Sequence, residues 1–259
     1  MALEEEFGEY KAMFRYEAKV FKEMVDGVAR ILDEGVIVVS REGLRLRGMD
    51  PARVAYIEID IPSSSFLEFD VVEDVESIDL GVSMETLVNV VKKSKKGDQL
   101  EVRIRDDKAL FIVEGVVVKR YMLPNLEVAA ELPGEVKLEH GVEASVIVDV
   151  VKKALKDAEL VGNIVEFEGS QDYLAIRGLG EARSRMEARL TPETPALLSL
   201  EVREPATSRY DIDYIKKVLN LTKIAESVYI GFSSDSPLEM VFNSPDGSRV
   251  RYVLAPASV

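Results

Sequence analysis

Cysteine and tryptophan are absent from the 259 residues, and histidine occurs once, at position 140. Without cysteine the chain forms no disulfide and carries no thiolate, and one histidine alone gives no zinc-binding spacing. No apolar run approaches the roughly 18–20 residues that cross a membrane. The start, MALEEEFGEY, is acidic and lacks the basic and apolar regions of a signal peptide. We therefore expect a cytoplasmic protein.

Catalytic patterns are missing too. His140 has no partner evident in the sequence, so we predict a surface residue rather than a base. RGLGEA (177–182) lacks a third glycine and indicates a hairpin turn, and no phosphate-binding Gly-x-x-x-x-Gly-Lys-Ser/Thr motif occurs. The carboxylate run EFDVVEDVESID (68–79) indicates a solvated or strand-edge segment. We predict no catalytic residue, no metal site and no cofactor. A carboxylate-dependent enzyme on a duplicated α+β scaffold is the alternative function.

The chain is rich in charged residues. Hydrophobic residues make up 47% and charged residues 31%, a globular composition. Abundant Glu, Lys and Arg without Cys or Trp indicates a thermophilic source. The formal net charge is −14, yet LVNVVKKSKKGDQLEV (87–102) places four lysines in five positions. A local basic surface on an acidic protein is compatible with nucleic-acid binding, because binding depends on where the charge lies.

The sequence is internally duplicated. EGLRLRGMD (42–50) matches QDYLAIRGLG (171–180), with Gly48 and Gly178 at equivalent places. METLVNVVKKSKKGDQLEVRI (84–104) matches DIDYIKKVLNLTKIAESVYIGF (211–232) at nearly the same offset. Since that offset is about half the chain, we predict two similar domains, each with two units of a helix followed by strands.

Alternating β-branched and aromatic residues predict mostly antiparallel strands, including one over ALFIVEGVVVKRYML (109–123). LPNLEVAAELPGEV (123–136) has two prolines and no period, which indicates a connector. The predicted fold is α+β, with two similar domains of antiparallel sheet plus two helices each. The expected parts are an acidic extension (1–11), an N-terminal domain (12–122), the connector (123–136) and a C-terminal domain (137–259).

Helical spacing places basic residues on one face of each predicted helix. Each residue of a helix advances by about 100° around the axis. Each predicted helix therefore has an apolar face and, on the opposite side, a face that carries lysine or arginine. The predicted helices cover 20–32, 84–96, 147–158 and 212–220. A single such face is an ordinary solvated surface. Four of them, arranged alike, would suit contact with the phosphates of a polyanion.

Several segments resemble proliferating cell nuclear antigen, the archaeal and eukaryotic sliding clamp. They are GLRLRGMDPARVAYIEIDIPSSSFLEFDV (43–71), SSDSPLEMVF (233–242) and the ending RVRYVLAPASV (249–259), and the similarity spans about Met13 to Pro256. The resemblance implies a DNA-clamp fold that closes, as a homotrimer or a heterotrimer, into a ring around duplex DNA. It implies a non-enzymatic processivity factor for replication and repair, associated with the nucleoid.

The resemblance also implies functional residues and partners. The lysines lining the hole would be Lys19, Lys22, Lys92, Lys93, Lys96, Lys152, Lys153, Lys156, Lys216 and Lys217. The groove for a partner's plug peptide would use Met49, Val54, Leu123, Leu126, Val128, Leu132, Pro237, Val253, Ala255 and Pro256. The subunit contact would use Val116, Val117, Val118, Tyr121, Arg183, Arg185, Met186 and Arg189. A clamp loader would supply the energy for loading, and DNA polymerase, flap endonuclease and DNA ligase would dock through plug peptides.

Overall fold

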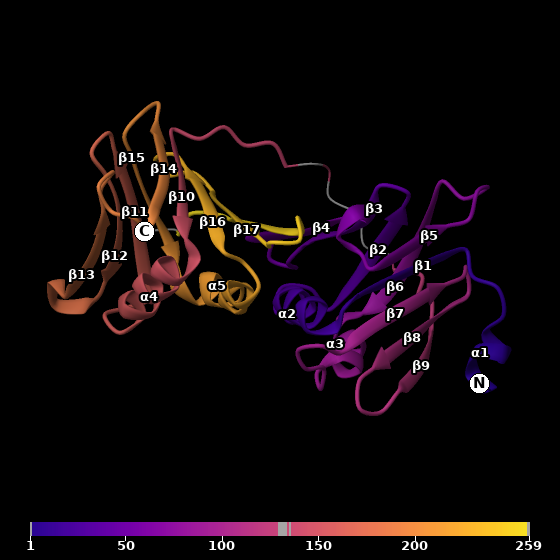
Figure 1. Cartoon of the computed structure of the whole chain (residues 1–259). Helices are drawn as coiled ribbons and strands as arrows, with labels where there is room; N and C mark the ends of the chain where they lie inside the picture. Colours follow the sequence, from indigo (N-terminus) through magenta and orange to yellow (C-terminus); the bar gives the residue numbers. More distant parts are fainter. Residues whose placement is uncertain (1, 129–133, 135, 258–259) are drawn as a thin grey trace. The chain divides into compact units, whose positions relative to one another are not determined.

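The computed structural model describes residues 2–128, 134 and 136–257 (Figure 1). The chain divides into two compact units. The first holds the described residues of 1–48, 58–133 and 246–248, and the second those of 49–57, 134–245 and 249–259. The main division therefore falls inside the predicted connector. Two short segments are exceptions: 49–57 belongs to the second unit although the residues on both sides of it belong to the first, and 246–248 belongs to the first although its neighbours belong to the second. Over the described residues, no helix is both long and apolar enough to cross a membrane.

The first unit consists of two antiparallel sheets and three helices. Its elements are α1 (Ala2–Phe7), β1 (Ala12–Glu17), α2 (Ala18–Val28), β2 (Glu34–Ser40), β3 (Gly43–Met49), β4 (Ala55–Pro62, which begins in the second unit), β5 (Glu68–Val71), β6 (Ser77–Ser83), α3 (Met84–Val91), β7 (Gln99–Ile104), β8 (Lys108–Glu114) and β9 (Lys119–Pro124). The strand orders are β5-β1-β7-β8-β9 and β4-β3-β2-β6.

Period-two alternation builds the core of this unit. In β1, Ala12, Phe14 and Tyr16 are buried while the residues between them are half-buried. Phe14 lies opposite Val102 of β7, which follows the same alternation. A slip of one residue would turn this apolar set outward, so the pattern fixes the register. The apolar arcs of α2 and α3 are buried, as the helical spacing predicts.

The second unit has the same plan. Its elements are β10 (Val142–Ile147), α4 (Val148–Glu159), β11 (Ile164–Ser170), β12 (Tyr173–Leu179), β13 (Arg185–Leu190), β14 (Leu197–Val202), β15 (Ala206–Asp211), α5 (Ile212–Lys216), β16 (Ser227–Phe232), β17 (Leu238–Asn243) and β18 (Arg249–Leu254). The strand orders are β13-β12-β11-β15 and β14-β10-β16-β17-β18. The order strand, helix, two paired strands occurs in β1-α2-β2-β3 and again in β10-α4-β11-β12, which confirms the duplication.

Two helices are shorter than their lysine-rich sequences predict. The helix predicted over 84–96 ends at Val91, because Asp98 accepts a hydrogen bond from the Lys95 backbone N–H (2.9 Å) and Gly97 adopts φ +92°. Such local side-chain bonds compete with the helix. The helix predicted over 212–220 ends at Lys216 and is followed by a 3₁₀ turn, Leu219–Lys223.

Other predicted boundaries also move. The helix predicted over 147–158 runs from Val148 to Glu159, and that predicted over 20–32 runs from Ala18 to Val28. The single strand predicted over 109–123 is wrong. The chain reverses there, so β8 and β9 pair with Val113 opposite Lys119. The β-branched run Val116–Val118 lies in the loop of this hairpin, where pairing rather than strand propensity decides the structure.

Candidate DNA-facing and partner-binding surfaces

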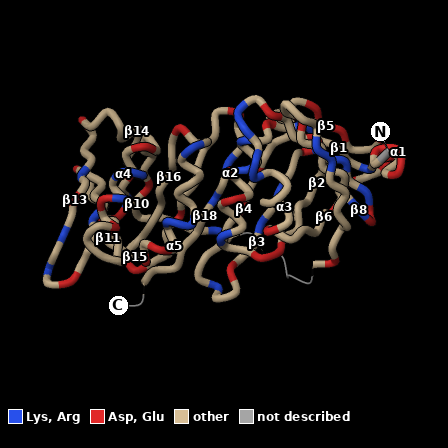
Figure 2. The backbone as a smooth tube through the Cα atoms, turned by 90° about the horizontal axis from the view of Figure 1, so that it is seen from below, with Lys and Arg blue, Asp and Glu red and all other residues tan. Residues whose placement is uncertain are grey.

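The predicted DNA-facing lysines of the first unit follow α2 and α3. Lys19 and Lys22 are half-buried on α2. Lys92, Lys93 and Lys96 are exposed, but they lie just beyond α3 rather than on it. Figure 2 shows Lys and Arg positions interspersed with Asp and Glu positions along the backbone. The lysine cluster of this unit is therefore carried by a turn at the end of a helix.

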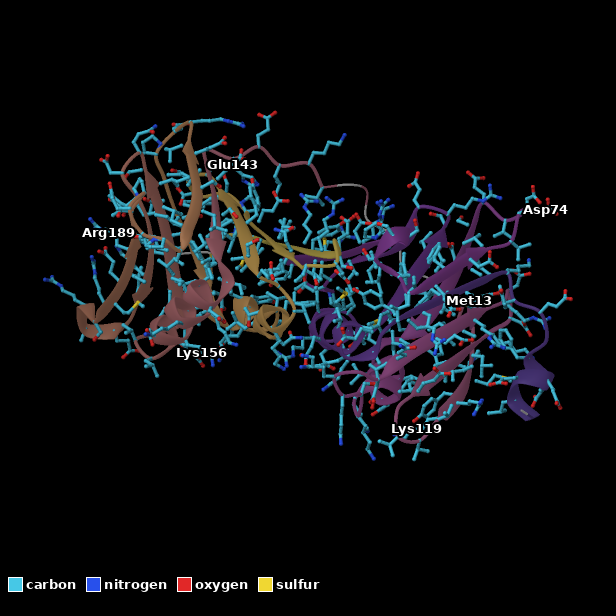
Figure 3. The ribbon with its side chains drawn as sticks, viewed as in Figure 1. Met13, Asp74, Lys119, Glu143, Lys156 and Arg189 are labelled. Atoms are coloured by element: carbon cyan, nitrogen blue, oxygen red, sulfur yellow. The ribbon has the colours of Figure 1, made fainter. Side chains whose placement is uncertain are left out.

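The predicted lysines of the second unit lie on α4 and around the end of α5. Lys152, Lys153 and Lys156 are on α4, and Lys153 and Lys156 are exposed. Lys156 is labelled in Figure 3. Lys216 is within 2.6 Å of Glu159 and 3.2 Å of Asp213. Its pKa is raised by these partners, first by Glu159 and then by Asp213. Part of the charge of Lys216 is therefore matched within the chain.

Lys217 packs against an aromatic ring. Its ammonium lies 4.1 Å from the centre of the Tyr214 ring, a cation–π geometry. The side chain is thereby held near the end of α5, since Tyr214 belongs to that helix.

The residues of the predicted subunit contact lie at open sheet edges. β9 ends the five-stranded sheet of the first unit, and β13 ends the four-stranded sheet of the second. Tyr121 is on β9. Val116, Val117 and Val118, in the hairpin loop before it, are exposed apolar side chains. Exposed apolar side chains gathered beside an unpaired strand are typical of a contact surface.

On β13 the predicted residues alternate in exposure. Arg185 and Arg189 are exposed and Met186 is half-buried, while Arg183 is exposed in the turn just before the strand. The Arg189 guanidinium lies 4.1 Å from the Tyr173 ring centre and 3.1 Å from Glu187. Arg189 is therefore tied to its own sheet.

A network around Arg177 joins the strands of that sheet. Arg177 donates to Glu187 (2.6 Å), Glu166 (3.1 Å) and Glu168. The hydrogen bond from Arg177, followed by that from the Tyr173 hydroxyl, lowers the pKa of Glu168. Because these residues come from β11, β12 and β13, the network holds the edge strand β13 in place.

The connector begins by attaching to β6. The Gly81 N–H donates to Asn125 Oδ1 (2.8 Å), and the Leu126 N–H donates to the Gly81 carbonyl (3.0 Å). Asn125 Nδ2 donates in addition to the carbonyls of Asp79 (2.8 Å) and Asp106 (3.1 Å). This attachment places the predicted groove residue Leu126 beside the edge of the sheet. No pattern in the sequence indicated this role of Asn125.

The other predicted groove residues are distributed over both units. Leu123, Leu126 and Val128 are half-buried in the first. Met49, Val54, Pro237, Ala255 and Pro256 are half-buried in the second, and Val253 is buried there. Leu132 lies outside the described residues. Their common groove stays a prediction.

The turn that carries Met49 and Val54 is held by one carboxylate. Asp50 Oδ1 accepts from the backbone N–H groups of Val54 and Ala55, both at 2.7 Å. The Val54 carbonyl in turn accepts from the Ala255 N–H (2.9 Å). The Met-Asp segment and the C-terminal segment are therefore neighbours within the second unit.

The prediction that His140 is a surface residue without a partner is wrong. His140 is 6% exposed, and its Nε2 lies 2.6 Å from Glu239 Oε2. Arg251 donates to the same carboxylate and, through NH2, to the Val136 carbonyl (2.6 Å). Although burial opposes it, hydrogen bonds from His140 and Arg251 lower the pKa of Glu239. The cluster ties β17 and β18 to the segment before β10.

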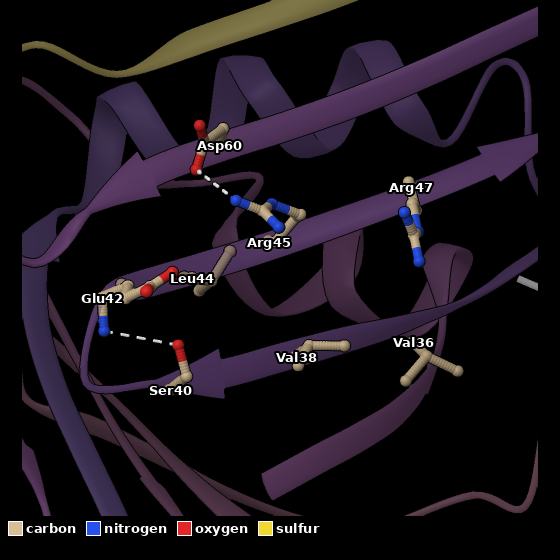
Figure 4. Close-up of a pocket in the computed structure, with 9 residues that line it drawn as sticks. Val36, Val38, Ser40, Glu42, Leu44, Arg45, Arg47 and Asp60 are labelled. Atoms are coloured by element: carbon tan, nitrogen blue, oxygen red, sulfur yellow. Dashed lines mark hydrogen bonds and ion pairs between the residues drawn. The ribbon is translucent and has the colours of Figure 1, made fainter. Parts of the chain in front are cut away.

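A hollow of about 130 Å³ lies on β2 and β3. Arg45, on β3, points toward Asp60 of β4 (3.9 Å), whereas Val36 and Val38 lie on the neighbouring strand β2 (Figure 4). Arg45 also lies 3.8 Å from Glu58. None of the predicted groove residues lines this hollow. Across residues 2–128, 134 and 136–257, no group of three or more acidic or histidine side chains could hold a metal ion.

The predicted extension contains a helix that we did not predict from the sequence. Residues 2–7 form the helix α1, and Phe7 is fully buried against Leu110 and Ile112 of β8. Leu3, Phe7 and Tyr10 have the i, i+4, i+7 spacing that could have predicted this packing.

Comparisons with known proteins agree with this fold. The model of the N-terminal domain of proliferating cell nuclear antigen matches residues 10–120. DNA polymerase sliding clamp 1 of Aeropyrum pernix is 63% identical over 246 residues, 95% of this chain and 100% of that protein. The PCNA2–PCNA3 complex of Sulfolobus tokodaii aligns with a TM-score of 0.86 at 24% identity, covering 94% of this chain and 98% of that one.

A further solved structure, the C-terminal region of FEN-1 bound to A. fulgidus PCNA, aligns with a TM-score of 0.86 at 22% identity, over 96% of this chain and 99% of that one. The chain therefore belongs to the DNA sliding clamp family of proliferating cell nuclear antigen. The predicted resemblance and fold class are confirmed. The relatives support the clamp rather than the alternative of a carboxylate-dependent enzyme.

Proposed function

We propose that the chain is one subunit of a ring that encircles duplex DNA and tethers replication and repair proteins to it. One observation carries the ring: each unit ends a sheet with an open strand, β9 in the first and β13 in the second. An unpaired strand edge is a template for another strand. A head-to-tail contact between different edges gives a ring when the rotation closes.

The subunit contact is testable by substituting the apolar residues beside the two edges. Val117 is exposed in the loop before β9, and Met186 is half-buried on β13. Val117→Asp or Met186→Asp should split the ring, because each places an unpaired charge in a contact that excludes water. Sizing chromatography with light scattering measures the result. Unchanged mass for both variants would mean that the contact lies elsewhere.

The lysines on the helices and in the turns that follow them would face the DNA. A duplex carries one negative charge per roughly 1.7 Å of its axis, and lysines bind phosphates without reading the bases. Lys92, Lys93, Lys96, Lys153 and Lys156 are exposed, as such contacts require. Each contact contributes little by itself, since exposed charge pairs are worth about 0–1 kcal/mol. The lysines should therefore act together and allow sliding.

A combined substitution tests the DNA-facing surface. The test variant changes to alanine Lys92, Lys96, Lys152, Lys156, Lys216 and Lys217. A matched control removes the same number of cations elsewhere on the exposed surface, namely Lys11, Arg41, Arg53, Lys137, Arg203 and Arg249. Both are loaded onto nicked circular DNA by the clamp loader, and the bound clamp is measured by gel filtration. The test variant should be lost from the DNA, with a shallower salt dependence because fewer counterions are released.

The control variant should remain bound, and linearising the circle should release both it and the unmodified clamp, because a ring slides off an end. If the test variant stays on the DNA as well as the control variant does, those lysines face solvent and do not contact the DNA. Retention after linearisation would contradict encirclement itself.

Partners would dock at the groove beside the connector. The A. fulgidus relative, whose structure holds the C-terminal region of FEN-1, supports flap endonuclease as one partner. DNA polymerase and DNA ligase would bind by similar plug peptides, and a clamp loader would open the ring. The half-buried apolar residues Leu126 and Pro256 suit the anchors of such a peptide. Like the Sulfolobus complex of two different clamp subunits, this chain would assemble with clamp subunits.

A further inference from the structure

The helix α1 precedes the residues 10–120 that match the family model. It lies at the β8–β9 side of the five-stranded sheet (Figure 1). Phe7 is fully buried and forms a cluster with Leu110 and Ile112, against which Leu3, Tyr10 and Met122 also pack. Because Leu110 and Met122 are paired residues of β8 and β9, the helix covers the sheet face next to its open edge.

Polar contacts fix α1 in this place. Arg120 Nε on β9 donates to Glu4 Oε1 (2.6 Å), and this hydrogen bond lowers the pKa of Glu4. Arg105 Nη1 donates to the Phe7 carbonyl (2.6 Å). Gly8 ends the helix because it adopts the left-handed region, at φ +74°. Its backbone N–H donates a hydrogen bond to the Glu4 carbonyl (3.2 Å). The helix is therefore held to β9 by a side-chain bond as well as by apolar packing.

Two acids of α1 remain turned to solvent. Glu5 and Glu6 are exposed, and α1 appears as an acidic turn at the N-terminus in Figure 2. Neither carboxylate has an ion-pair partner within 4.0 Å in the described part of the chain. β9, beneath the helix, is the last strand of its sheet. This edge therefore offers unpaired backbone groups together with unmatched negative charge.

The other open edge carries the opposite charge. Arg185, Glu187 and Arg189 share one face of β13, on the side of the Arg177 network, while Met186 and Leu190 face the other way. Arg189 and Glu187 are bound to each other. Arg183 and Arg185 are exposed and have no ion-pair partner within 4.0 Å among residues 2–128, 134 and 136–257.

We propose that α1 enlarges the subunit contact, so that its exposed acids receive Arg183 and Arg185 from β13 of a second copy of this chain. The inference rests on the proposed ring contact between β9 and β13. Paired strands lie roughly 4.8 Å apart and keep their faces aligned, so the arginine face of the incoming strand continues the face that α1 covers. A second copy is the occupant that fits, because one chain carries both complementary edges.

Charge reversal tests the proposal without disturbing the buried side of α1. The test variant is Glu5→Lys/Glu6→Lys. Its matched control, Asp74→Lys/Glu76→Lys, makes the same charge change at exposed positions after β5, the opposite edge of the same sheet. A third variant adds Arg183→Glu/Arg185→Glu to the test variant, which restores complementarity between copies.

Sedimentation velocity over a concentration series measures assembly of the full chain. At low salt the test variant should associate about three- to tenfold more weakly per contact than the control, and the difference should shrink in 0.5 M salt. The third variant should recover most of the loss. If the full chain stays monomeric at every concentration, a second copy of this chain does not bind at this edge, and the proposal is wrong.

A missing α1 contact and a missing ring contact give different results. If the test variant assembles like the control while Met186→Asp still splits the ring, α1 takes no part in the contact and the proposed ring stands. If Val117→Asp and Met186→Asp also assemble normally, the β9–β13 contact is wrong, and the proposed role of α1 is wrong as well.

Discussion

Gly81→Ala should detach the start of the connector from β6. A Cβ built on Gly81 would lie 1.9 Å from the Leu126 carbonyl oxygen, where real contacts are essentially never under 3.0 Å. Because the obstacle is backbone, the connector must move by roughly 1 Å or more. The two hydrogen bonds between Gly81 and the pair Asn125–Leu126 would then break or lengthen.

The size of the effect follows from those two bonds. At about 0.5–1.5 kcal/mol for each hydrogen bond, local opening at Leu126 should become easier by about 1–3 kcal/mol. Amide exchange at Leu126 should accelerate by about 5- to 150-fold, since a local opening equilibrium sets that rate. Binding of a plug peptide should weaken, because Leu126 would no longer be held in place. The form that the family resemblance implies for such a peptide is Gln-x-x-Ile-x-x-Phe-Phe.

Hydrogen exchange with mass spectrometry measures the first quantity, and calorimetry measures the second. Gly134→Ala is the matched control, since its Cβ would meet nothing within 4 Å in the same connector. The control should change neither quantity, and the melting temperatures of both variants should confirm that they fold. An unchanged Leu126 exchange rate in Gly81→Ala would refute this reasoning, whatever happens to the peptide.

Three further predictions concern stability and binding. The pKa of Glu239 is lowered from its ordinary value of 4.5. The ionised Glu239 carboxylate therefore stabilises the fold at pH values above 4.5, and this stabilisation is lost as the pH falls through the lowered pKa. The destabilisation caused by Glu239→Gln, measured by urea unfolding, should therefore shrink below about pH 4.5, and a constant difference would contradict the bond to His140. Phe7→Ala should lower the free energy of urea unfolding by up to about 3 kcal/mol, whereas an unchanged value would mean that α1 does not pack on the sheet. Leu126→Ser with Pro256→Ser should weaken peptide binding by about 2 kcal/mol in calorimetry while the oligomeric mass stays constant, and equal affinity would exclude both from the groove.

The sequence by itself determined the architecture. Apolar alternation predicted a chain built mostly of antiparallel strands, and helical spacing predicted the buried arcs of α2 and α3. These are periodic signals, repeated over several residues and in both halves, so a local error does not remove them. The duplication then required two units of one plan, and the short motifs around Met49 and at Leu254–Pro256 pointed to the clamp family.

Tertiary structure decided what has no period in the sequence. The loop at Val116–Val118 exists because β8 and β9 pair, although its residues favour strands. His140 is buried because Glu239 and Arg251, about 100 residues later, supply the partners that its burial requires. Phe7 is buried only because β8 offers Leu110 and Ile112 on an otherwise open face. Contacts between distant residues depend on the assembled sheets, and for that reason local sequence alone could not predict them.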